Sequence, residues 1–289
     1  MTRTRYQPPA LALHWNGHRW QQVPTASLGT MNARLDSVAV VTAKDAWAVG
    51  YAGQDTLIEH WNGTRWLRAA SPNPPGQDLL GAVTAISPDD IWAVGEDYTS
   101  GSTGDTTLTL AEHWNGSSWT QVPAKNPGGT GESYFSGVSA ISPDSIWAVG
   151  VANPDPQDFA PDQTLAEHWN GSSWQVAPTP DPGHGPLGND LNDVAAISAK
   201  DAWAVGVFDD GSHDLRLAEH WNGKKWSTIP VSFPAGPKSG FDLSGITALS
   251  ASQAWAVGSY DPDFADPITR TVIARWNGAK WTRTPSPNP

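Results

Sequence analysis

Carboxylates and two histidines are the side chains of this 289-residue chain that could do acid–base chemistry. A general acid and a general base must both lie within hydrogen-bond reach of one substrate, so paired carboxylates would suit a glycoside hydrolase, lyase or cyclase. No serine–histidine–aspartate order and no HExxH spacing is present. The candidate catalytic residues are Asp190, Asp242, Glu96, His184 and His213, and no pair among them stands out.

A larger set of acidic, aromatic and polar residues could bind a ligand without reacting with it. Carboxylates accept hydrogen bonds from sugar hydroxyls, and tyrosine and phenylalanine rings stack on sugar rings. The alternative is that the acids are solvated loop residues and the aromatics hold long loops in place. The candidate ligand-binding residues are Arg34, Asp36, Tyr51, Glu96, Tyr98, Tyr134, Asp190, Asn192, Phe208, Asp242 and Tyr260.

No metal site is predicted. Five histidines occupy one repeat position, whereas metal ligands must converge on one point. We expect them, and the glutamates beside them, to make hydrogen bonds between repeats. Calcium is the one cofactor left open, because 209–211 and 261–263 have the composition of a calcium loop without its D-x-[DN]-x-[DN]-G spacing. The residues concerned are His14, His60, His113, His168 and His220, and Glu59, Glu112, Glu167 and Glu219.

Two signatures recur along the chain and must position these candidates. Trp-Ala-Val-Gly occurs five times and Trp-Asn-Gly-x-x-Trp six times, and together they contain all 17 tryptophans. Self-similarity at a period of about 50 residues indicates a repeat architecture. In the clearest copy, strands are predicted at 83–87, 91–95 and 110–114 and from Trp119 to Pro123, with a tight Asn115-Gly116 hairpin in which both residues have positive φ.

Four short antiparallel strands per repeat, without helical periodicity, predict an all-β chain folded as a β-propeller of four-stranded blades. The tryptophans would form the packing layer between blades, since each buries roughly 150–250 Å². The connections between strands 2 and 3, and from strand 4 to the next strand 1, are long and variable. We expect them on one acidic and aromatic face, where a rigid scaffold usually carries its binding site.

The order of Trp-Ala-Val-Gly and Trp-Asn-Gly-x-x-Trp resembles the Kelch and galactose-oxidase type of propeller repeat. It is more similar to uncharacterised bacterial propellers with Trp-Ala-Val-Gly and His-Trp-Asn-Gly repeats, and more distantly to photosystem-assembly-factor and sialidase-type propellers. The resemblance covers Leu11 to Pro285 and implies a fold, not a function. The copper site of galactose oxidase is not implied, because it needs a cysteine and this chain has none.

The repeats are predicted to form one propeller domain over residues 1–289, with residues 1–10 a flexible N-terminal segment. Five complete units run from about Leu35 to Pro285, and a hairpin at 11–24 repeats only strands 3 and 4. We prefer a ring of five closed blades with this hairpin as an addition. A sixth blade, completed by another chain or by further residues, is the alternative, and the unpaired hairpin could then mediate homo-oligomer formation.

The composition of the chain excludes some classes of binding partner. With 17 Lys and Arg against 29 Asp and Glu, the net charge of −12 argues against nucleic acid, whose phosphates need clustered basic residues. No run approaches the roughly 18 apolar residues that span a membrane, so no membrane partner is expected. The chain carries no signal peptide, and the absence of cysteine and the polar loops favour a secreted or cell-surface protein, represented here by its mature part.

These observations favour a non-enzymatic, lectin-like propeller that binds a carbohydrate or polar small molecule on the loop-rich face. The variable loops predict one asymmetric site, while grooves between blades would predict several equal sites. One alternative is an enzyme that uses loop carboxylates at the mouth of the central channel. Another is a protein-interaction scaffold.

Overall fold

The computed structural model of the chain describes residues 10–26, 32–74, 76–101, 105–129, 131–154, 160–231, 241–260 and 269–287. Residues 1–9 of the predicted flexible segment and the 261–263 part of the calcium prediction lie outside these ranges. The chain divides into two compact units, Met1–Pro123 (unit 1) and Ala124–Pro289 (unit 2). The single domain over residues 1–289 stays a prediction.

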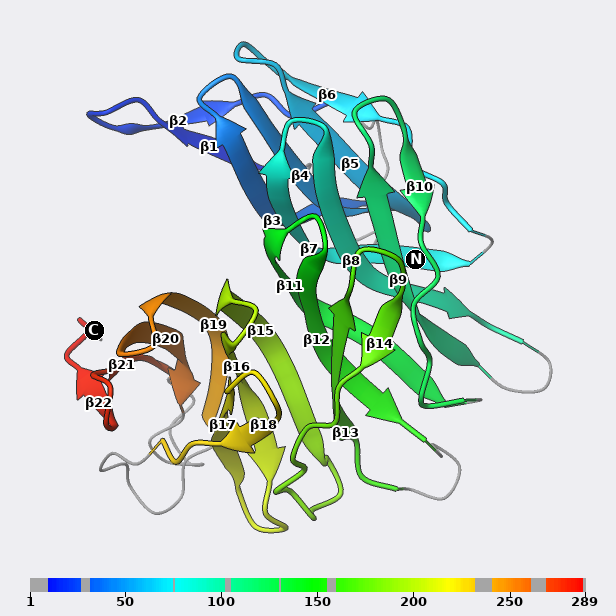
Figure 1. The fold of residues 1–289 in the computed structure, drawn as a ribbon. Helices are drawn as coiled ribbons and strands as arrows, with labels where there is room; N and C mark the ends of the chain where they lie inside the picture. Colours follow the sequence, from blue (N-terminus) through cyan, green and yellow to red (C-terminus); the bar gives the residue numbers. More distant parts are fainter. Residues whose placement is uncertain are drawn as a thin grey trace, which may run out of the picture. The chain divides into compact units, whose positions relative to one another are not determined.

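All regular structure of the described residues is β, as the sequence predicted (Figure 1). No helix long and apolar enough to cross a membrane is found among them. Within the hairpin and within each blade, the strands pair in the order of the chain, each antiparallel to the next.

Unit 1 contains one two-stranded hairpin and two four-stranded sheets, which we call blades 1 and 2. The hairpin consists of β1 (Ala12–Trp15) and β2 (Trp20–Val23). Blade 1 consists of β3 (Ala33–Thr42), β4 (Asp45–Ala52), β5 (Asp55–Trp61) and β6 (Trp66–Ala69). Blade 2 consists of β7 (Gln77–Ser87), β8 (Asp90–Thr99), β9 (Thr106–Trp114) and β10 (Trp119–Gln121).

Unit 2 contains three four-stranded sheets, blades 3 to 5. Blade 3 consists of β11 (Glu132–Ser142), β12 (Ser145–Asn153), β13 (Gln163–Trp169) and β14 (Trp174–Val176). Blade 4 consists of β15 (Asn189–Ser198), β16 (Asp201–Asp209), β17 (Asp214–Trp221) and β18 (Trp226–Thr228). Blade 5 consists of β19 (Phe241–Ser250), β20 (Gln253–Tyr260), β21 (Arg270–Trp276) and β22 (Trp281–Thr284).

The first two strands of each blade are longer than the sequence predicted. In blade 2 the β7–β8 ladder continues past Gly95 to the pair Gln77 and Tyr98. The residues added to the end of β8, Glu96 to Thr99, are polar or aromatic, so the apolar pattern that marked this strand ends at Gly95. Tyr51, Glu96, Tyr98, Phe208 and Tyr260, predicted in loops, therefore lie on strands.

The glycine of Trp-Ala-Val-Gly is required by a bulge in the first strand. A Cβ added to Gly206 would lie 1.9 Å from the carbonyl oxygen of Asp190, and one added to Gly258 would lie 2.1 Å from that of Asp242. The first strand then skips one residue of its register, after Leu191 in blade 4 and after Leu243 in blade 5. Close backbone approach, which only glycine allows, thus fixes the bulge in every blade.

The tryptophans form the packing layer between blades, as predicted. Trp203 of blade 4 is 1% exposed and packs against Trp276 and Trp281 of blade 5, with ring centroids 5.0 and 5.4 Å apart. In unit 1, Trp47 of blade 1 packs in the same way against Trp114 and Trp119 of blade 2. The second-strand tryptophan of one blade therefore covers the last two strands of the next.

The repeated histidines bond within a blade, not between blades as the sequence suggested. The Nε2 atoms of His60, His113 and His220 lie 2.8–2.9 Å from the aspartate that begins the second strand, and His168 bonds the serine there. Each imidazole also packs on its own blade's second-strand tryptophan. The next strand of the same sheet is nearer than the neighbouring blade, which the spacing alone did not reveal.

Three of the repeated glutamates accept hydrogen bonds from the chain segment that leads into their own blade, so hydrogen bonds between blades stay a prediction for them. Glu112 accepts hydrogen bonds from Ser71 Oγ, and Glu167 accepts them from the Lys125 N–H. Glu59 accepts one from the Ala26 N–H at the end of the hairpin. Glu219 is fully buried, and its two carboxylate oxygens have no hydrogen-bond partner among the described residues.

The Asn-Gly turns differ in detail from the tight hairpin that the sequence suggested. Gly116 has φ of 87°, but Asn115 keeps a negative φ, since Asn73 is the sole non-glycine residue with positive φ among the described residues. Four residues join the strands, and the Asn115 side chain accepts hydrogen bonds from the N–H groups of Ser117 and Ser118. The asparagine acts through its side chain, as an Asx turn does.

Candidate ligand-binding site

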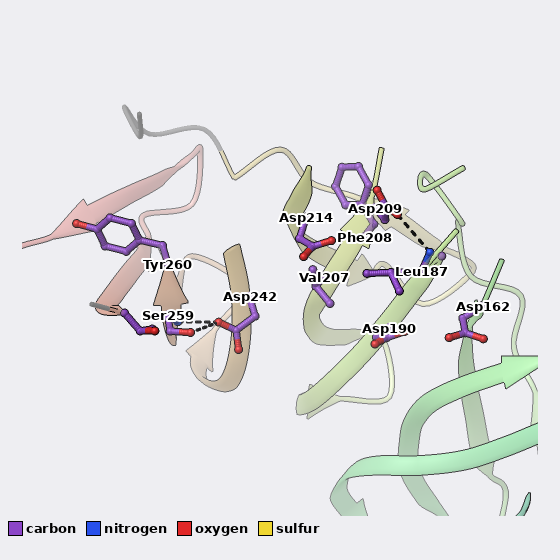
Figure 2. Close-up of a pocket in the computed structure, with 12 residues that line it drawn as sticks. Asp162, Leu187, Asp190, Val207, Phe208, Asp209, Asp214, Asp242, Ser259 and Tyr260 are labelled. Atoms are coloured by element: carbon purple, nitrogen blue, oxygen red, sulfur yellow. Dashed lines mark hydrogen bonds between the residues drawn. The ribbon is translucent and has the colours of Figure 1, made fainter. Parts of the chain in front are cut away.

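A cavity of about 400 Å³ opens in unit 2 where blades 4 and 5 begin. Four predicted ligand-binding residues line it, together with three further aspartates (Figure 2). Its lining residues come from the ends of β15, β16, β17, β19 and β20 and from the segments beside them, and the binding face stays a prediction. Its lining residues are Asp162, Leu187, Gly188, Asp190, Val207, Phe208, Asp209, Asp214, Asp242, Ser259, Tyr260 and Thr269.

Asp190 and Asp242 occupy one repeat position in blades 4 and 5. Asp190 pairs with Val207 across β15 and β16, and Asp242 pairs with Ser259 across β19 and β20. Each lies two residues before the bulge residue, at what we call the position before the bulge, and its carbonyl faces the glycine of Trp-Ala-Val-Gly. The repeated scaffold therefore fixes the backbone of both residues, and both side chains line the cavity.

Asp190 is the most strongly perturbed group that lines the cavity. Burial, with the negative charges of Asp162 and Asp214, raises its pKa to about 6. Its Oδ1 is buried and has no hydrogen-bond partner among the described residues. The carboxyl group is thus half-charged just below neutral pH, with one oxygen that no protein donor satisfies.

Asp242 is held firmly by its neighbours. Its Oδ1 accepts hydrogen bonds from the N–H of Ser259 at 2.8 Å and from the Ser259 hydroxyl at 2.6 Å, while Ser244 Oγ donates to Oδ2 at 2.8 Å. Figure 2 shows the Ser259 bonds as dashed lines. These three donors keep the carboxylate in one orientation, so it suits binding better than proton transfer.

The other aspartates come from the ends of neighbouring strands. Asp209 and Asp214 face each other across β16 and β17. Asp209 is buried and accepts hydrogen bonds from the N–H groups of Leu187 and Gly211. Burial and the charge of Asp209 raise the pKa of Asp214, and burial raises that of Asp162 against the hydrogen bond from Asn153. Negative charge is thus concentrated around one space.

Two aromatic rings border the cavity. Phe208 lies at the end of β16 and also packs on the core of blade 4. Tyr260 is 9% exposed, and its hydroxyl accepts a hydrogen bond of 2.8 Å from Arg283, whose guanidinium lies over the ring. The contacts with Arg283 hold the Tyr260 ring in place.

The predicted residues of unit 1 form a different arrangement at the same repeat position. Arg34 stands where blades 4 and 5 have aspartate, opposite Tyr51, and forms an ion pair with Asp36 at the bulge. Burial raises the pKa of Asp36, and Arg34 opposes this effect. The charges of this pair offset each other, so blade 1 does not repeat the acidic site.

Glu96 and Tyr98 of blade 2 lie on β8. Glu96 pairs with Leu79, so this blade has an apolar residue at the position of Asp190. The Tyr98 hydroxyl bonds Asp105 and, with Ser100, lowers the pKa of that carboxyl. Tyr98 thus holds its own loop, as the alternative reading of the aromatics expected.

The remaining predicted residues of unit 2 do not line the cavity. Tyr134 lies on β11 opposite Val151. Asn192, the bulge residue of blade 4, donates from Nδ2 to the Leu243 carbonyl and so links blades 4 and 5. His184 and His213 are not among the lining residues; Nδ1 of His213 lies 3.9 Å from Asp210.

Asp162 and Asp214 are the lining carboxylates that the sequence did not single out. Asp162 lies in the loop before β13, and its carbonyl accepts hydrogen bonds from Asn189 at the start of β15. Asp214 opens β17. Acidic residues at both ends of the β16–β17 turn were a usable signal. The approach of the blade 3 loop to blade 4 was not visible in the sequence.

No group of three histidine, aspartate or glutamate side chains in the described part of the chain is arranged to hold a metal ion. Calcium at 261–263 stays a prediction outside the described residues.

Comparison with known proteins identifies the fold. No model of a protein family matches the chain, and no curated protein matches it. Among solved structures, YCF48 from Cyanidioschyzon merolae is similar with a TM-score of 0.51 and 15% identity, over 93% of this chain and 76% of that one.

Two further structures are similar at a TM-score of 0.45. They are a xylan β-1,4-xylosidase from Bacillus halodurans C-125, at 9% identity over 85% of this chain and 53% of that one, and a Penicillium chrysogenum α-L-arabinanase complexed with arabinobiose, at 12% identity over 67% and 63%. These similarities are too low to carry function. With the four-stranded antiparallel sheets, the likeness to YCF48 identifies this chain as a β-propeller.

Proposed function

We propose that this propeller binds a carbohydrate or a similarly polar small molecule in the cavity of unit 2. The observation that carries the proposal is that Asp190, Asp242, Phe208 and Tyr260 all line one cavity. Carboxylates that accept hydrogen bonds from hydroxyl groups, beside aromatic rings that cover an apolar ring face, are the complement of a sugar.

The charge of the cavity restricts the ligand further. Five aspartates line it, and none of its lining residues is lysine, arginine or histidine. A uronic acid or phosphorylated sugar would meet like charges in a partly buried site, which costs free energy. The proposed ligand is therefore a neutral sugar or an amino sugar, with the cationic form favoured above pH 6, where Asp190 is ionised.

The site is expected to bind one ligand per chain. Aspartate occupies the position before the bulge in blades 4 and 5, whereas the other blades have Arg34, Leu79 and Tyr134 there. A volume of about 400 Å³ suits a molecule of one or two sugar rings, since ligand pockets typically measure roughly 300–1,000 Å³.

A glycan array on the purified chain, repeated with EDTA, tests the proposal, followed by calorimetry on each hit. Binding of neutral or amino sugars at one equivalent, unaffected by EDTA, is the expected result. Several equivalents per chain would move the site to the grooves between blades. No binding at millimolar glycan, or binding of acidic glycans alone, would overturn the proposal.

An enzyme is the second candidate, and the pKa of Asp190 is the observation that favours it. A carboxyl group with a pKa of about 6, in one cavity with Asp162 and Asp214, can exchange a proton near neutral pH. This candidate predicts turnover of aryl glycosides and its loss in Asp190→Asn with the ligand still bound. Binding without turnover over a broad substrate panel would exclude it.

A further inference from the structure

The β1–β2 hairpin of unit 1 corresponds in sequence and position to the last two strands of a blade. It carries the same Trp-Asn-Gly-x-x-Trp signature as the complete blades. The Ala26 N–H just after β2 donates to Glu59 of blade 1 at 3.1 Å. Ser71, just after β6, makes the equivalent bond to Glu112 of blade 2. The hairpin therefore packs on blade 1 as a preceding blade would, although its own first two strands are missing from the described residues.

Side chains of the hairpin lack the partners that those strands supply elsewhere. In the complete blades, Nε1 of the tryptophan before Asn-Gly donates to a carbonyl in the turn between the first two strands, as Trp114 does to Pro88 at 3.2 Å. The histidine beside it bonds the residue that begins the second strand, as His113 does to Asp90. Among the described residues, no hydrogen bond of Trp15 Nε1 or of the His14 ring is found, and His14 stacks instead on Trp61.

The flank of blade 1 beside the hairpin is exposed where other blades are covered. Val38 on β3 is 59% exposed, whereas its equivalents Val83, Val138 and Val194 are 7%, 8% and 4% exposed. The same contrast holds in the last strand, where Trp66 is half-buried and its equivalents Trp119, Trp174, Trp226 and Trp281 are buried. Among the described residues, no layer of side chains covers these positions as one does in blades 2 to 4.

A groove marks the missing layer. It has a volume of about 340 Å³, and residues of the hairpin, β3, β5 and β6 line it, including Leu13, Trp20, Val40 and Trp61. A second hollow of about 230 Å³, which shares Leu13, Val38 and Trp66 with it, lies beside Leu35 and Ala48. His14 is the one lining residue of the groove with a titratable side chain.

The complete blades reveal what fills this space. Trp47 of blade 1 contacts Trp114 and Trp119 of blade 2, and Val49 joins Val83 and Leu110 in the same core. The Trp-x-Val face of a second strand thus covers the next blade, while its backbone pairs with the strand that carries the histidine. The groove beside the hairpin corresponds to this interface, without the strand pair that presents Trp-x-Val.

We propose that a partner polypeptide docks here with a β-strand pair that presents Trp-x-Val on one face. Its strand would add to the free edge of β1, where main-chain hydrogen bonds supply affinity and side-chain sockets supply specificity. The tryptophan would enter the groove against Trp61 and Trp66, and the valine would cover Val38. A second copy of this chain is the less suitable partner, because the strand pairs of blades 1 to 5 are already paired within their own sheets.

A synthetic peptide with the sequence of residues 189–209 is the probe, since it contains the first two strands of blade 4. Calorimetry should detect one peptide per chain, and Val38→Lys should weaken binding at least tenfold because it places a charge in the apolar contact. Val257→Lys on blade 5 is the matched control, as Val257 is 48% exposed. A peptide with Trp203→Ala and Val205→Ala should bind at least tenfold more weakly than the unmodified one.

Thermal unfolding of Val38→Lys, which should match that of the unchanged chain, confirms that the fold is intact. Glycan binding should also be unchanged, so this test is separate from the proposed function. Failure of the peptide to bind at millimolar concentration, or equal binding to Val38→Lys, would overturn the proposal. So would a dimer in sedimentation experiments that Val38→Lys dissociates and the peptide does not, because that result assigns the groove to a second copy.

Discussion

Blade 1 and blade 4 have the same backbone at the position before the bulge but opposite chemistry. In blade 1, Arg34 and Asp36 form an ion pair. In blade 4, Asp190 faces a cavity with Asp162 and Asp214, and burial raises its pKa to about 6. The added Cβ of Gly50 would lie 2.0 Å from the Arg34 carbonyl, as that of Gly206 would lie 1.9 Å from the Asp190 carbonyl.

This difference separates the scaffold from the site. Trp-Ala-Val-Gly and the bulge are common to all five blades because they build the sheet and its packing. The side chain at the position before the bulge differs from blade to blade. Binding residues are therefore to be sought among the repeat positions that differ in type, on a backbone that does not.

The largest effect is expected from Gly206→Ala. The new Cβ would overlap the Asp190 carbonyl, so we expect a loss of about 1–3 kcal/mol of unfolding free energy, or more, and a loss of ligand binding. Gly95→Ala in blade 2 should cost about as much, because its Cβ would lie 1.9 Å from the Leu79 carbonyl, but it should leave ligand affinity unchanged. Urea unfolding and calorimetry measure both. Equal losses of ligand affinity in Gly206→Ala and Gly95→Ala would show that the scaffold and the site are not independent.

Asp190→Asn should weaken ligand binding about tenfold to a hundredfold. A hydrogen bond to a charged group contributes about 1.5–3 kcal/mol, and an amide replaces the charge while keeping the shape. The control is Leu79→Asn at the equivalent position of blade 2, which should leave affinity unchanged. Calorimetry at pH 7 with the glycan identified by the array checks both variants. Unchanged affinity in Asp190→Asn would remove that residue from the site.

The same variant should change the pH dependence of stability. Asp190 ionises near its ordinary pKa of 3.8 in the unfolded chain and near 6 in the folded one, so the folded state binds more protons between these values. Its contribution to stability therefore falls as pH rises from about 4 to 6 and stays low above 6. Asp190→Asn should unfold at higher urea than the unchanged chain at pH 7 and show a smaller advantage at pH 4. A constant difference across this range would contradict the raised pKa.

The smallest effect is expected from Val40→Lys in blade 1. Val40 is 68% exposed on β3, so the change should alter the unfolding free energy by less than about 0.5 kcal/mol. Val205→Lys in blade 4 is the contrasting variant, because Val205 is fully buried and the charge would have no partner. Urea unfolding compares the two. A marked loss in Val40→Lys would mean that this flank is covered in solution.

Much of the fold could be predicted from residue spacing. The strands, their antiparallel order and the packing role of the tryptophans follow from local pattern, because alternation and turn residues act over a few positions. The extra length of β7 and β8 escaped prediction, since polar residues such as Asp78 and Asp97 continue the ladder without an apolar pattern. The histidines were assigned to the wrong partner for a similar reason, as spacing along the chain does not distinguish the next strand from the next blade.

The candidate site was only partly predictable. The sequence by itself determined the repeat, the glycine that forces the bulge and the acidic character of Asp190 and Asp242, because each depends on local sterics or composition. The tertiary structure decided that Asp162, Asp209 and Asp214 join them, that Arg34 is matched by Asp36, and that Val38 lies beside an open groove. These outcomes depend on which side chains distant segments bring together, and burial and neighbouring charge act only once the chain has folded.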